Sequence, residues 1–218
     1  MTSIAEDVLA AFRIVSTASV ADAVELQGVR GYMSGGIRMQ TPGAGTLAGP
    51  AVTVREVPTE EAEPPTHALA AIDESDPGSV VCIDAGGADV AVWGGLMTAG
   101  AVARGIAGAV LDAGVRDVTE IQRDYPQFPV YSRWSVPATT VGRYRTVSLN
   151  EPVVLGGVSV HPGDLIVADR DGVVRVPARL ITAVLDAATE IERREREQTR
   201  LILDTGSLRD GLAKYNRI

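Results

Sequence analysis

The first third of the chain changes from a helical to an extended hydrophobic pattern. Apolar residues recur every three or four positions from Ile4 to Val15, which predicts an amphipathic helix. The run Ser19 to Asp22 fits a capping box and predicts the start of a second helix. From Ala51 to Val57 the pattern alternates like a half-buried strand, which Pro58 is expected to stop. Residues 1–30 are therefore expected to be N-terminal helices that precede the first strand.

The middle third alternates helical and strand patterns. After Pro64-Pro65 the expected elements are a helix at Thr66 to Glu74, a strand at Val80 to Asp84, a helix at Gly95 to Arg104, a strand at Gly108 to Asp112, and a helical turn at Val115 to Gln122. Strands that alternate with helices are usually parallel and covered by those helices. This part of the chain therefore predicts a parallel sheet.

Beyond Pro129 the pattern changes to short strands joined by tight turns. Gly156-Gly157 separates two short apolar runs, which is a two-residue hairpin signal. A second hairpin is expected at Leu165 to Val176, with residues 169–172 as a longer turn. Ala178 to Leu203 predicts a long helix that opens a helical region at 178–218, and its second half, Glu192 to Arg200, is almost wholly polar. That polar half is either a solvated face or a segment that reaches a neighbouring subunit.

Composition limits the class of protein. The 218 residues contain no low-complexity linker, so we expect a single domain at 1–218 with a mixed α/β fold. The net charge of −8 and the absence of a basic stripe argue against nucleic acid as a partner. No apolar run approaches the ~20 residues that span a bilayer, and the N-terminus has no basic leader, so we expect a cytoplasmic protein without a membrane partner. Cys82 lies in an apolar run and is expected to be a buried structural thiol.

Two segments carry candidate chemistry. Gly94-Gly95 directly precedes a predicted helix, whose free amides would favour an anion, although the glycines could equally serve close packing. Arg116 offers a planar fork for a carboxylate, while Asp117 and Glu120 offer the hard oxygens that Mg²⁺ or Mn²⁺ prefers. On a helical turn these three side chains can face one way. A surface ion pair is the alternative, but the segment follows a strand, where α/β sheets place their ligands.

Other candidate groups are weaker. Asp84 to Gly87 follows a strand but lacks the G-x-G-x-x-G spacing of a dinucleotide site. Lys214, the only lysine, lies near the C-terminus, which argues against a Schiff-base mechanism. His67 and His161 are the only histidines and are candidate bases, but a water held by a metal ion or by Arg116 is the better proton carrier.

Five segments together resemble one family. They are Thr17 to Ala23, Gly49 to Val54, Gly94 to Gly100, Gly108 to Glu120, and Pro162 to Pro177. Their order resembles that of the RraA-like family, which includes regulators of RNase E activity and class II 4-hydroxy-4-methyl-2-oxoglutarate aldolases with oxaloacetate decarboxylase activity. The resemblance implies a compact α/β sandwich with a swivelling-domain-like mixed β core and outer helices. It also implies homotrimers or hexamers with sites between subunits.

The resemblance assigns roles to individual residues. It implies that Arg116 grips the carboxylate or carbonyl of the substrate, that Asp117 ligates Mg²⁺ or Mn²⁺, and that the pyruvyl end meets the amides of Gly94, Gly95, Leu96 and Met97. The aldolases often have an aspartate at the position of Gly95. Here Glu120 resembles the replacement metal partner of a sister subgroup.

Two functions remain open at this point. The first is a divalent-metal-dependent pyruvate aldolase or 2-oxo acid lyase that acts on a small 2-oxo acid through a metal-stabilised pyruvate enolate. The second is a non-catalytic, protein-binding regulator of the RNase E inhibitor type. In an assembly, Glu192, Glu195 or Glu197 could lend an outer-shell carboxylate to the metal of a neighbouring subunit.

Overall fold

The computed structural model describes residues 4–34 and 36–215. The helices are α1 (Glu6–Phe12), α2 (Thr17–Leu26), α3 (Thr66–Asp73), α4 (Gly95–Ala103), α5 (Val118–Asp124), α6 (Ile181–Thr205), which follows a 3₁₀ turn at Ala178–Leu180, and α7 (Leu208–Tyr215). The strands are β1 (Arg38–Thr41), β2 (Leu47–Pro58), β3 (Val80–Asp84), β4 (Ala91–Trp93), β5 (Gly108–Val115), β6 (Val130–Ser135), β7 (Tyr144–Leu149), β8 (Val153–Leu155), β9 (Val158–Val160), β10 (Leu165–Asp169) and β11 (Gly172–Val176).

A mixed sheet organises the molecule. Within the described residues its order is β1-β6-β5-β3-β2-β10-β11, with β4 beside β5 and β7 beside β2. The central strands β2, β3, β5 and β6 are parallel, as the alternation of helix and strand predicts. The long strand β2 pairs through Leu47–Pro50 with β10 and through its later residues with β3 and β7. One strand therefore joins the parallel part of the sheet to the antiparallel hairpin β10–β11.

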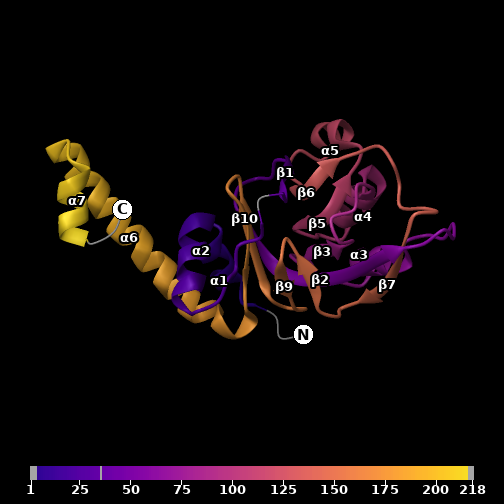
Figure 1. The fold of residues 1–218 in the computed structure, drawn as a ribbon, viewed down its shortest axis with the longest axis horizontal. Helices are drawn as coiled ribbons and strands as arrows, with labels where there is room; N and C mark the ends of the chain where they lie inside the picture. The colour runs from indigo at the N-terminus through magenta and orange to yellow at the C-terminus, as the bar shows by residue number, and fades with distance from the viewer. Residues whose placement is uncertain (1–3, 35, 216–218) are drawn as a thin grey trace.

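The sheet curls towards closure and has helices on both outer sides. A bridge between Tyr32 and Val174 connects the segment before β1 to β11. One apolar core lies between the parallel strands and α3, α4 and α5, and another lies between β10–β11 and α1, α2 and α6. A third core fills the concave side, where the hairpin β8–β9 packs. Figure 1 shows the two helical groups on opposite sides of the strands. The fold class expected from the sequence is confirmed.

Several local expectations are confirmed. The hairpin β8–β9 turns at Gly156-Gly157, and both glycines have the positive φ (54° and 79°) that such a turn requires. The strand Val80–Asp84 has the expected limits, and the helix α4 begins at Gly95 as expected and ends one residue before the predicted Arg104. Cys82 is fully buried, and burial raises the pKa of its thiol well above the usual range, as expected for a structural residue. No helix in the described part of the chain is long and apolar enough to cross a membrane.

Other local expectations were wrong. The second helix begins at Thr17 and is capped by Ser16, whose side chain accepts a hydrogen bond from the amide of Ser19, so Ser19 is not the cap. The first helix spans only Glu6–Phe12. The turn of the second hairpin contains two residues, because Asp169 already pairs with Gly172 across the strands. The short strand β4, the edge strand β7 and the helix α7 were not predicted.

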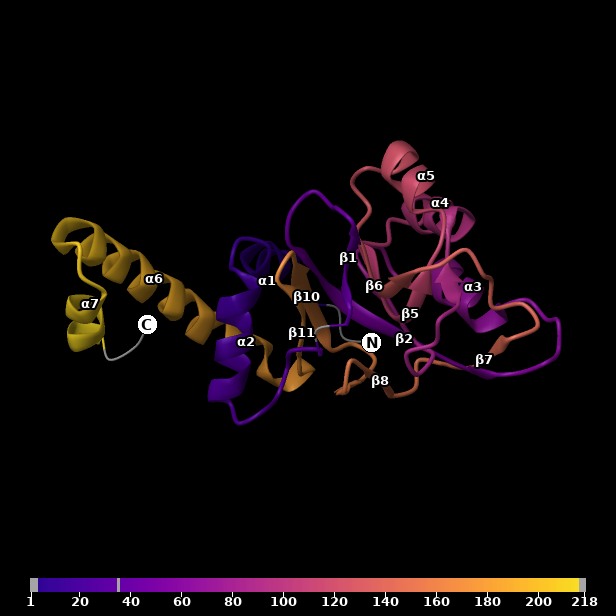
Figure 2. The same ribbon diagram turned by 45° about the horizontal axis from the view of Figure 1, so that its top comes forward.

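The polar second half of the C-terminal helix is not wholly exposed. The first half of α6 packs against α2 and buries Val184, Ala188 and Ile191. Its polar second half extends away from the sheet, and α7 folds back beside it (Figure 2). Gln198 is buried under this contact, where Gly211 lies close to it. Part of the polar stretch is therefore covered by the chain itself. Residues 216–218 of the predicted helical region lie outside the described residues.

Candidate active site

The segment between β5 and α5 places the predicted acidic residues. β5 continues to Val115, three residues beyond the predicted end, and α5 begins only at Val118. Asp117 is the N-cap of α5 and has a left-handed backbone with φ 59°. The predicted helical turn is confirmed from Val118 onwards, but its expected start at Val115 is wrong, so Arg116 does not lie on the same helical face as Glu120. An aspartate tolerates the left-handed conformation, which turns the chain sharply at the carboxyl end of β5.

Asp117 is tied to the start of α4. Its Oδ2 accepts a hydrogen bond from the amide of Gly95 at 3.0 Å. Gly94, the N-cap of α4, lies against the same side chain, since a β-carbon on Gly94 would come within 2.8 Å of Oδ2 of Asp117. A β-carbon on Gly95 would lie 3.1 Å from Oε1 of Glu120. A side chain at either position would crowd a carboxylate from the segment 117–120, and the approach is closest at Gly94.

The next two amides of α4 are available to a ligand. Leu96 and Met97 lie in the first turn, where helical amides lack an acceptor four residues back. Within residues 4–34 and 36–215 neither amide donates a hydrogen bond. Leu96 is also 89% exposed, although it lies next to a buried glycine. The start of α4 therefore offers free donors on an open surface, beside two carboxylates.

Arg116 lies at the edge of the same site. Its backbone amide donates to the carbonyl of Trp93, which fixes the chain before Asp117. Its Nε is 3.6 Å from Oδ2 of Asp117, and the Arg116 side chain is 42% exposed. Arg116 and Asp117 line an open pocket of about 290 Å³ together with Ser135, Val136 and Pro137. Sequence reasoning missed these three residues, the last of β6 and the two that follow it, because nothing in their local pattern marks them.

The acidic pair fits one kind of metal ion. In the described part of the chain no three His, Cys, Asp or Glu side chains gather closely enough to hold a metal ion by themselves. A closed tetrahedral zinc site is therefore a poor fit. Mg²⁺ often takes one or two carboxylates and keeps several waters. Asp117 as a direct ligand and Glu120 as a direct or water-bridged partner fit that chemistry.

The other candidate groups lie elsewhere. His67 is in the first turn of α3, and its Nδ1 is 2.9 Å from Oγ1 of Thr146. His161 precedes the turn before β10, and its Nε2 is 3.3 Å from Oγ of Ser159. Lys214 is on α7, at the opposite end of the molecule from α4 and α5 (Figure 1). None of these three residues lines the pocket beside Arg116.

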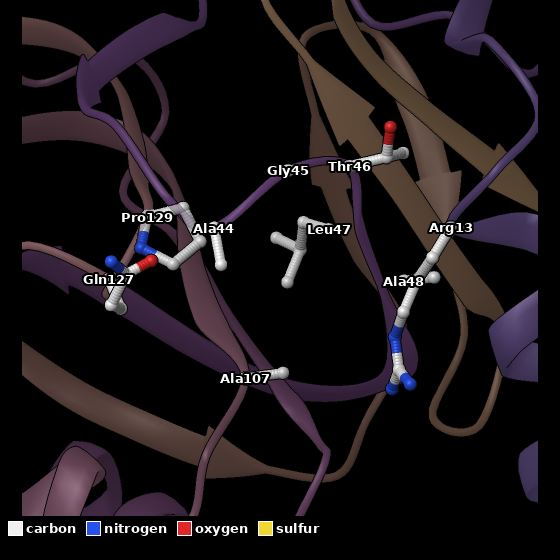
Figure 3. A pocket seen from close by; sticks show the side chains of 9 residues that line it. All are labelled: Arg13, Ala44, Gly45, Thr46, Leu47, Ala48, Ala107, Gln127 and Pro129. Atoms are coloured by element: carbon white, nitrogen blue, oxygen red, sulfur yellow. The ribbon is translucent and has the colours of Figure 1, made fainter.

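A second pocket lies at the other edge of the sheet. It is formed where β2, β5 and β6 begin, whereas Arg116 follows the carboxyl end of β5. Figure 3 shows Gln127 and Pro129 on one side of this pocket, Arg13 on the other, and Leu47 between them. Arg13 is paired with Glu6 at 2.5 Å. The lining residues include no carboxylate, histidine or cysteine, so this pocket lacks the groups for metal-assisted chemistry.

Comparison with known proteins gives the family. The model of the family described as "RraA-like: Aldolase/RraA" matches residues 17–175. The chain belongs to the RraA-like family. The protein named "Putative 4-hydroxy-4-methyl-2-oxoglutarate aldolase" from Halalkalibacterium halodurans is 33% identical over 162 residues, 72% of each chain. The structure of RraAS2 from Streptomyces coelicolor, described as an unusual member of the RNase ES inhibitor RraA protein family, superposes with a TM-score of 0.82 and 28% identity over 90% of this chain and 98% of that chain.

Two further matches define the extent of the likeness. A crystal structure of an uncharacterized protein from Pseudomonas syringae covers 97% of this chain and 99% of that chain, with 32% identity and a TM-score of 0.84. Protein DlpA of Legionella pneumophila is 31% identical over 196 residues, which are 88% of this chain but only 31% of DlpA. The chain therefore spans about a third of the length of that relative.

Proposed function

We propose that this protein is a divalent-metal-dependent lyase that forms pyruvate from a small 2-oxo acid, by aldol cleavage or decarboxylation. The observation that carries the proposal is the bond from the Gly95 amide to Asp117, with Glu120 beside it. It places two carboxylates next to the free amides of Leu96 and Met97. A cation site beside an anion site suits the oxygens of a 2-oxo acid.

The proposed reaction needs positive charge to stabilise an enolate, and it needs no covalent bond between the enzyme and the substrate. Cleavage of the C3–C4 bond of a 4-hydroxy-2-oxo acid leaves the bonding electron pair in the enolate of pyruvate, while the 4-hydroxyl loses its proton and becomes a carbonyl. Asp117, with Glu120 as its partner, would hold Mg²⁺ or Mn²⁺, which would supply positive charge for the developing enolate. In the decarboxylation of oxaloacetate, the C3–C4 bond breaks as carbon dioxide leaves. The electron pair of that bond forms the same enolate of pyruvate.

The residues of the chain have separate tasks in this account. The guanidinium of Arg116 binds the carboxylate or carbonyl oxygen through its planar fork. The amides of Leu96 and Met97 donate to the pyruvyl carboxylate at the start of α4. A water held beside Arg116 returns the proton to C3 of the enolate, since no histidine lines the pocket.

A non-catalytic regulator is the second candidate function. The likeness to RraAS2, whose description names an RNase ES inhibitor family, favours this alternative. Such a protein would bind its partner through its surface and would have no need of a working metal site. The acidic net charge of −8 suits a basic partner surface.

Oxalate distinguishes the two candidates, because it mimics the enolate of pyruvate. Calorimetric titration of oxalate should show binding only when Mg²⁺ or Mn²⁺ is present, and Asp117→Ala should abolish that binding. Asp124→Ala, which removes an exposed carboxylate at the end of α5, is the matched control and should bind normally. Absence of oxalate binding by the wild-type protein at millimolar metal concentration would favour the regulator.

A further inference from the structure

A buried chain of hydrogen bonds lies behind the first turn of α4. The indole Nε1 of Trp93 donates to Oγ1 of Thr98 at 2.8 Å. Oγ1 of Thr98 is 3.1 Å from the carbonyl oxygen of Gly94, and the backbone amide of Thr98 donates to the same oxygen at 3.0 Å. Trp93 is 1% exposed and Thr98 is fully buried. Trp93 also stacks on Phe128, with ring centroids 6.0 Å apart, so its indole has a fixed orientation.

The donor and the acceptor of each of these hydrogen bonds are fixed by the chemistry of the groups. An indole N–H can only donate, so the hydroxyl of Thr98 must accept from Trp93. The single hydroxyl proton is then free to donate to the carbonyl of Gly94. Among the described residues no other acceptor is bonded to this hydroxyl, so the arrangement has one stable polarity. Trp93 therefore directs the hydroxyl of Thr98 onto one carbonyl oxygen.

That carbonyl belongs to the peptide plane that carries the Gly95 amide. In a trans peptide the C=O of one residue and the N–H of the next point in opposite directions within one plane. Fixing the oxygen of Gly94 therefore fixes the direction of the Gly95 N–H. This N–H donates to Oδ2 of Asp117 at 3.0 Å. The orientation of the Asp117 carboxylate is thus linked to Thr98 through one rigid peptide unit.

We infer that Thr98, oriented by Trp93, is a positioning residue that aims the Gly95 amide and thereby holds the carboxylate of Asp117 for its ligand. This inference rests on the proposed function only for the identity of that ligand. The bond from Gly95 to Asp117 occupies Oδ2 and leaves Oδ1 for a cation. Thr98 touches neither substrate nor metal in this account, so it acts only through the backbone of Gly94 and Gly95.

The test compares three variants of the full-length protein by hydrogen exchange and by Mg²⁺ titration. Thr98→Val keeps the shape of the side chain and removes its hydroxyl, whereas Thr98→Ser keeps the hydroxyl. Thr53→Val is the matched control, because Thr53 is also fully buried and its Oγ1 donates to a backbone carbonyl, that of Glu151, at 2.7 Å. Exchange of the Gly95 amide is measured without metal, so this readout does not depend on any activity.

We expect Thr98→Val to show about tenfold faster exchange of the Gly95 amide and about tenfold weaker binding of Mg²⁺, near the upper end of the effect of losing one hydrogen bond between neutral groups. Thr98→Ser should stay within about twofold of the wild type in both measurements. Thr53→Val should lower the melting temperature and leave both measurements unchanged. An unchanged Gly95 exchange rate in Thr98→Val, or equal damage in Thr98→Ser, would overturn the inference. A wild-type protein that binds no Mg²⁺ would instead refute the proposed function, and the exchange rates would still decide the role of Thr98.

Discussion

Gly95 and Glu120 occupy complementary space, since a β-carbon on Gly95 would lie 3.1 Å from Oε1 of Glu120. The carboxylate of Glu120 thus stands close to where a side chain at position 95 would begin. The resemblance in sequence implies that the aldolases often have an aspartate at this position. A carboxylate attached at position 95 or at position 120 would therefore occupy the same part of the site.

This relationship predicts a compensating pair of substitutions. Glu120→Ala should weaken Mg²⁺ binding about tenfold, because it removes a supporting carboxylate while Asp117 remains. Adding Gly95→Asp to Glu120→Ala should recover most of that affinity, since the new carboxylate begins in the vacated space. Gly95→Asp alone should bind Mg²⁺ poorly, because its side chain collides with Glu120. Calorimetric titration of the three variants checks this order, and a double variant no better than Glu120→Ala would contradict it.

Arg116→Lys tests the guanidinium fork. A lysine retains the charge but cannot present two parallel donors to a carboxylate. We expect kcat/KM for oxaloacetate to fall about a hundredfold, with Mg²⁺ affinity close to that of the wild type. Arg123→Lys, an exposed residue of α5 that pairs with Asp124, is the matched control and should be fully active. Equal activity of Arg116→Lys and the wild type would contradict this role, because it would show that a positive charge at position 116 is sufficient without the guanidinium fork.

Glu56 gives the protein a specific dependence of stability on pH. This β2 residue is 4% exposed, and neither of its carboxylate oxygens has a hydrogen-bond partner within the described residues. Burial raises the pKa of Glu56 from 4.5 to about 7. Between these values the folded protein holds a proton that the unfolded chain releases. The contribution of Glu56 to stability is therefore largest below pH 4.5 and is lost as the pH rises towards 7.

Glu56→Gln should remove this dependence. At pH 8 the variant should unfold at higher urea concentration, with a gain of up to about 3 kcal/mol, whereas near pH 4 it should match the wild type. Glu60→Gln, an exposed residue of the following loop, should change stability at neither pH. Urea denaturation at a fixed protein concentration measures the difference. A wild type whose stability is flat between pH 5 and pH 8 would contradict the assignment.

The C-terminal helices lead to a prediction about assembly. Figures 1 and 2 place α6 and α7 at the opposite end of the molecule from α4 and α5, so their carboxylates can reach a site only in another copy. Glu192 accepts a hydrogen bond from the amide of Ser16, and Glu197 pairs with Arg193. Glu195 is exposed and forms neither kind of contact within the part of the chain described. It is therefore the best candidate to serve a neighbouring subunit.

We propose a trimer or a dimer of trimers in which Glu195 supports the neighbouring site. Light scattering over a dilution series should show the assembly, and truncation after Ile191 should weaken it. Glu195→Gln should lower Mg²⁺ affinity about tenfold in the assembled protein, while Glu197→Gln should not. A fully active monomer at assay concentration would rule out a shared site.

The sequence predicted the fold better than the local geometry of the site. Periodicity and turn residues located β2, β3, β5 and both hairpins, since these signals are local, whereas β1 and β6 were not predicted. The strand β4 contains only three residues, which is too short for a periodic pattern. The left-handed backbone of Asp117 was missed because the surrounding residues also suit a helical turn. In the alternation of β2, Glu56 shares the side of Val52 and Val54, and it is buried as they are although its side chain is charged.

The candidate residues themselves came together, but for a different reason from the one expected. A single helical face would have aligned Arg116, Asp117 and Glu120. In the structure the sharp turn at Asp117 aligns them, and the bond to Gly95 connects them to α4. The contacts of Thr98 with Gly94 and Trp93 are local, but the bond from Gly95 to Asp117 that gives them a role depends on tertiary structure. The approach of residues 135–137 to Arg116 also depends on tertiary structure, so no local pattern indicates it.

Release of pyruvate from oxaloacetate tests the central claim most directly. The account predicts pyruvate formation above the spontaneous and metal-only background with Mg²⁺ or Mn²⁺, loss of that activity with a chelator, and its loss in Asp117→Ala. Pyruvate formation by the wild-type protein that is unchanged by the chelator, or retained by Asp117→Ala, would contradict the metal-dependent mechanism.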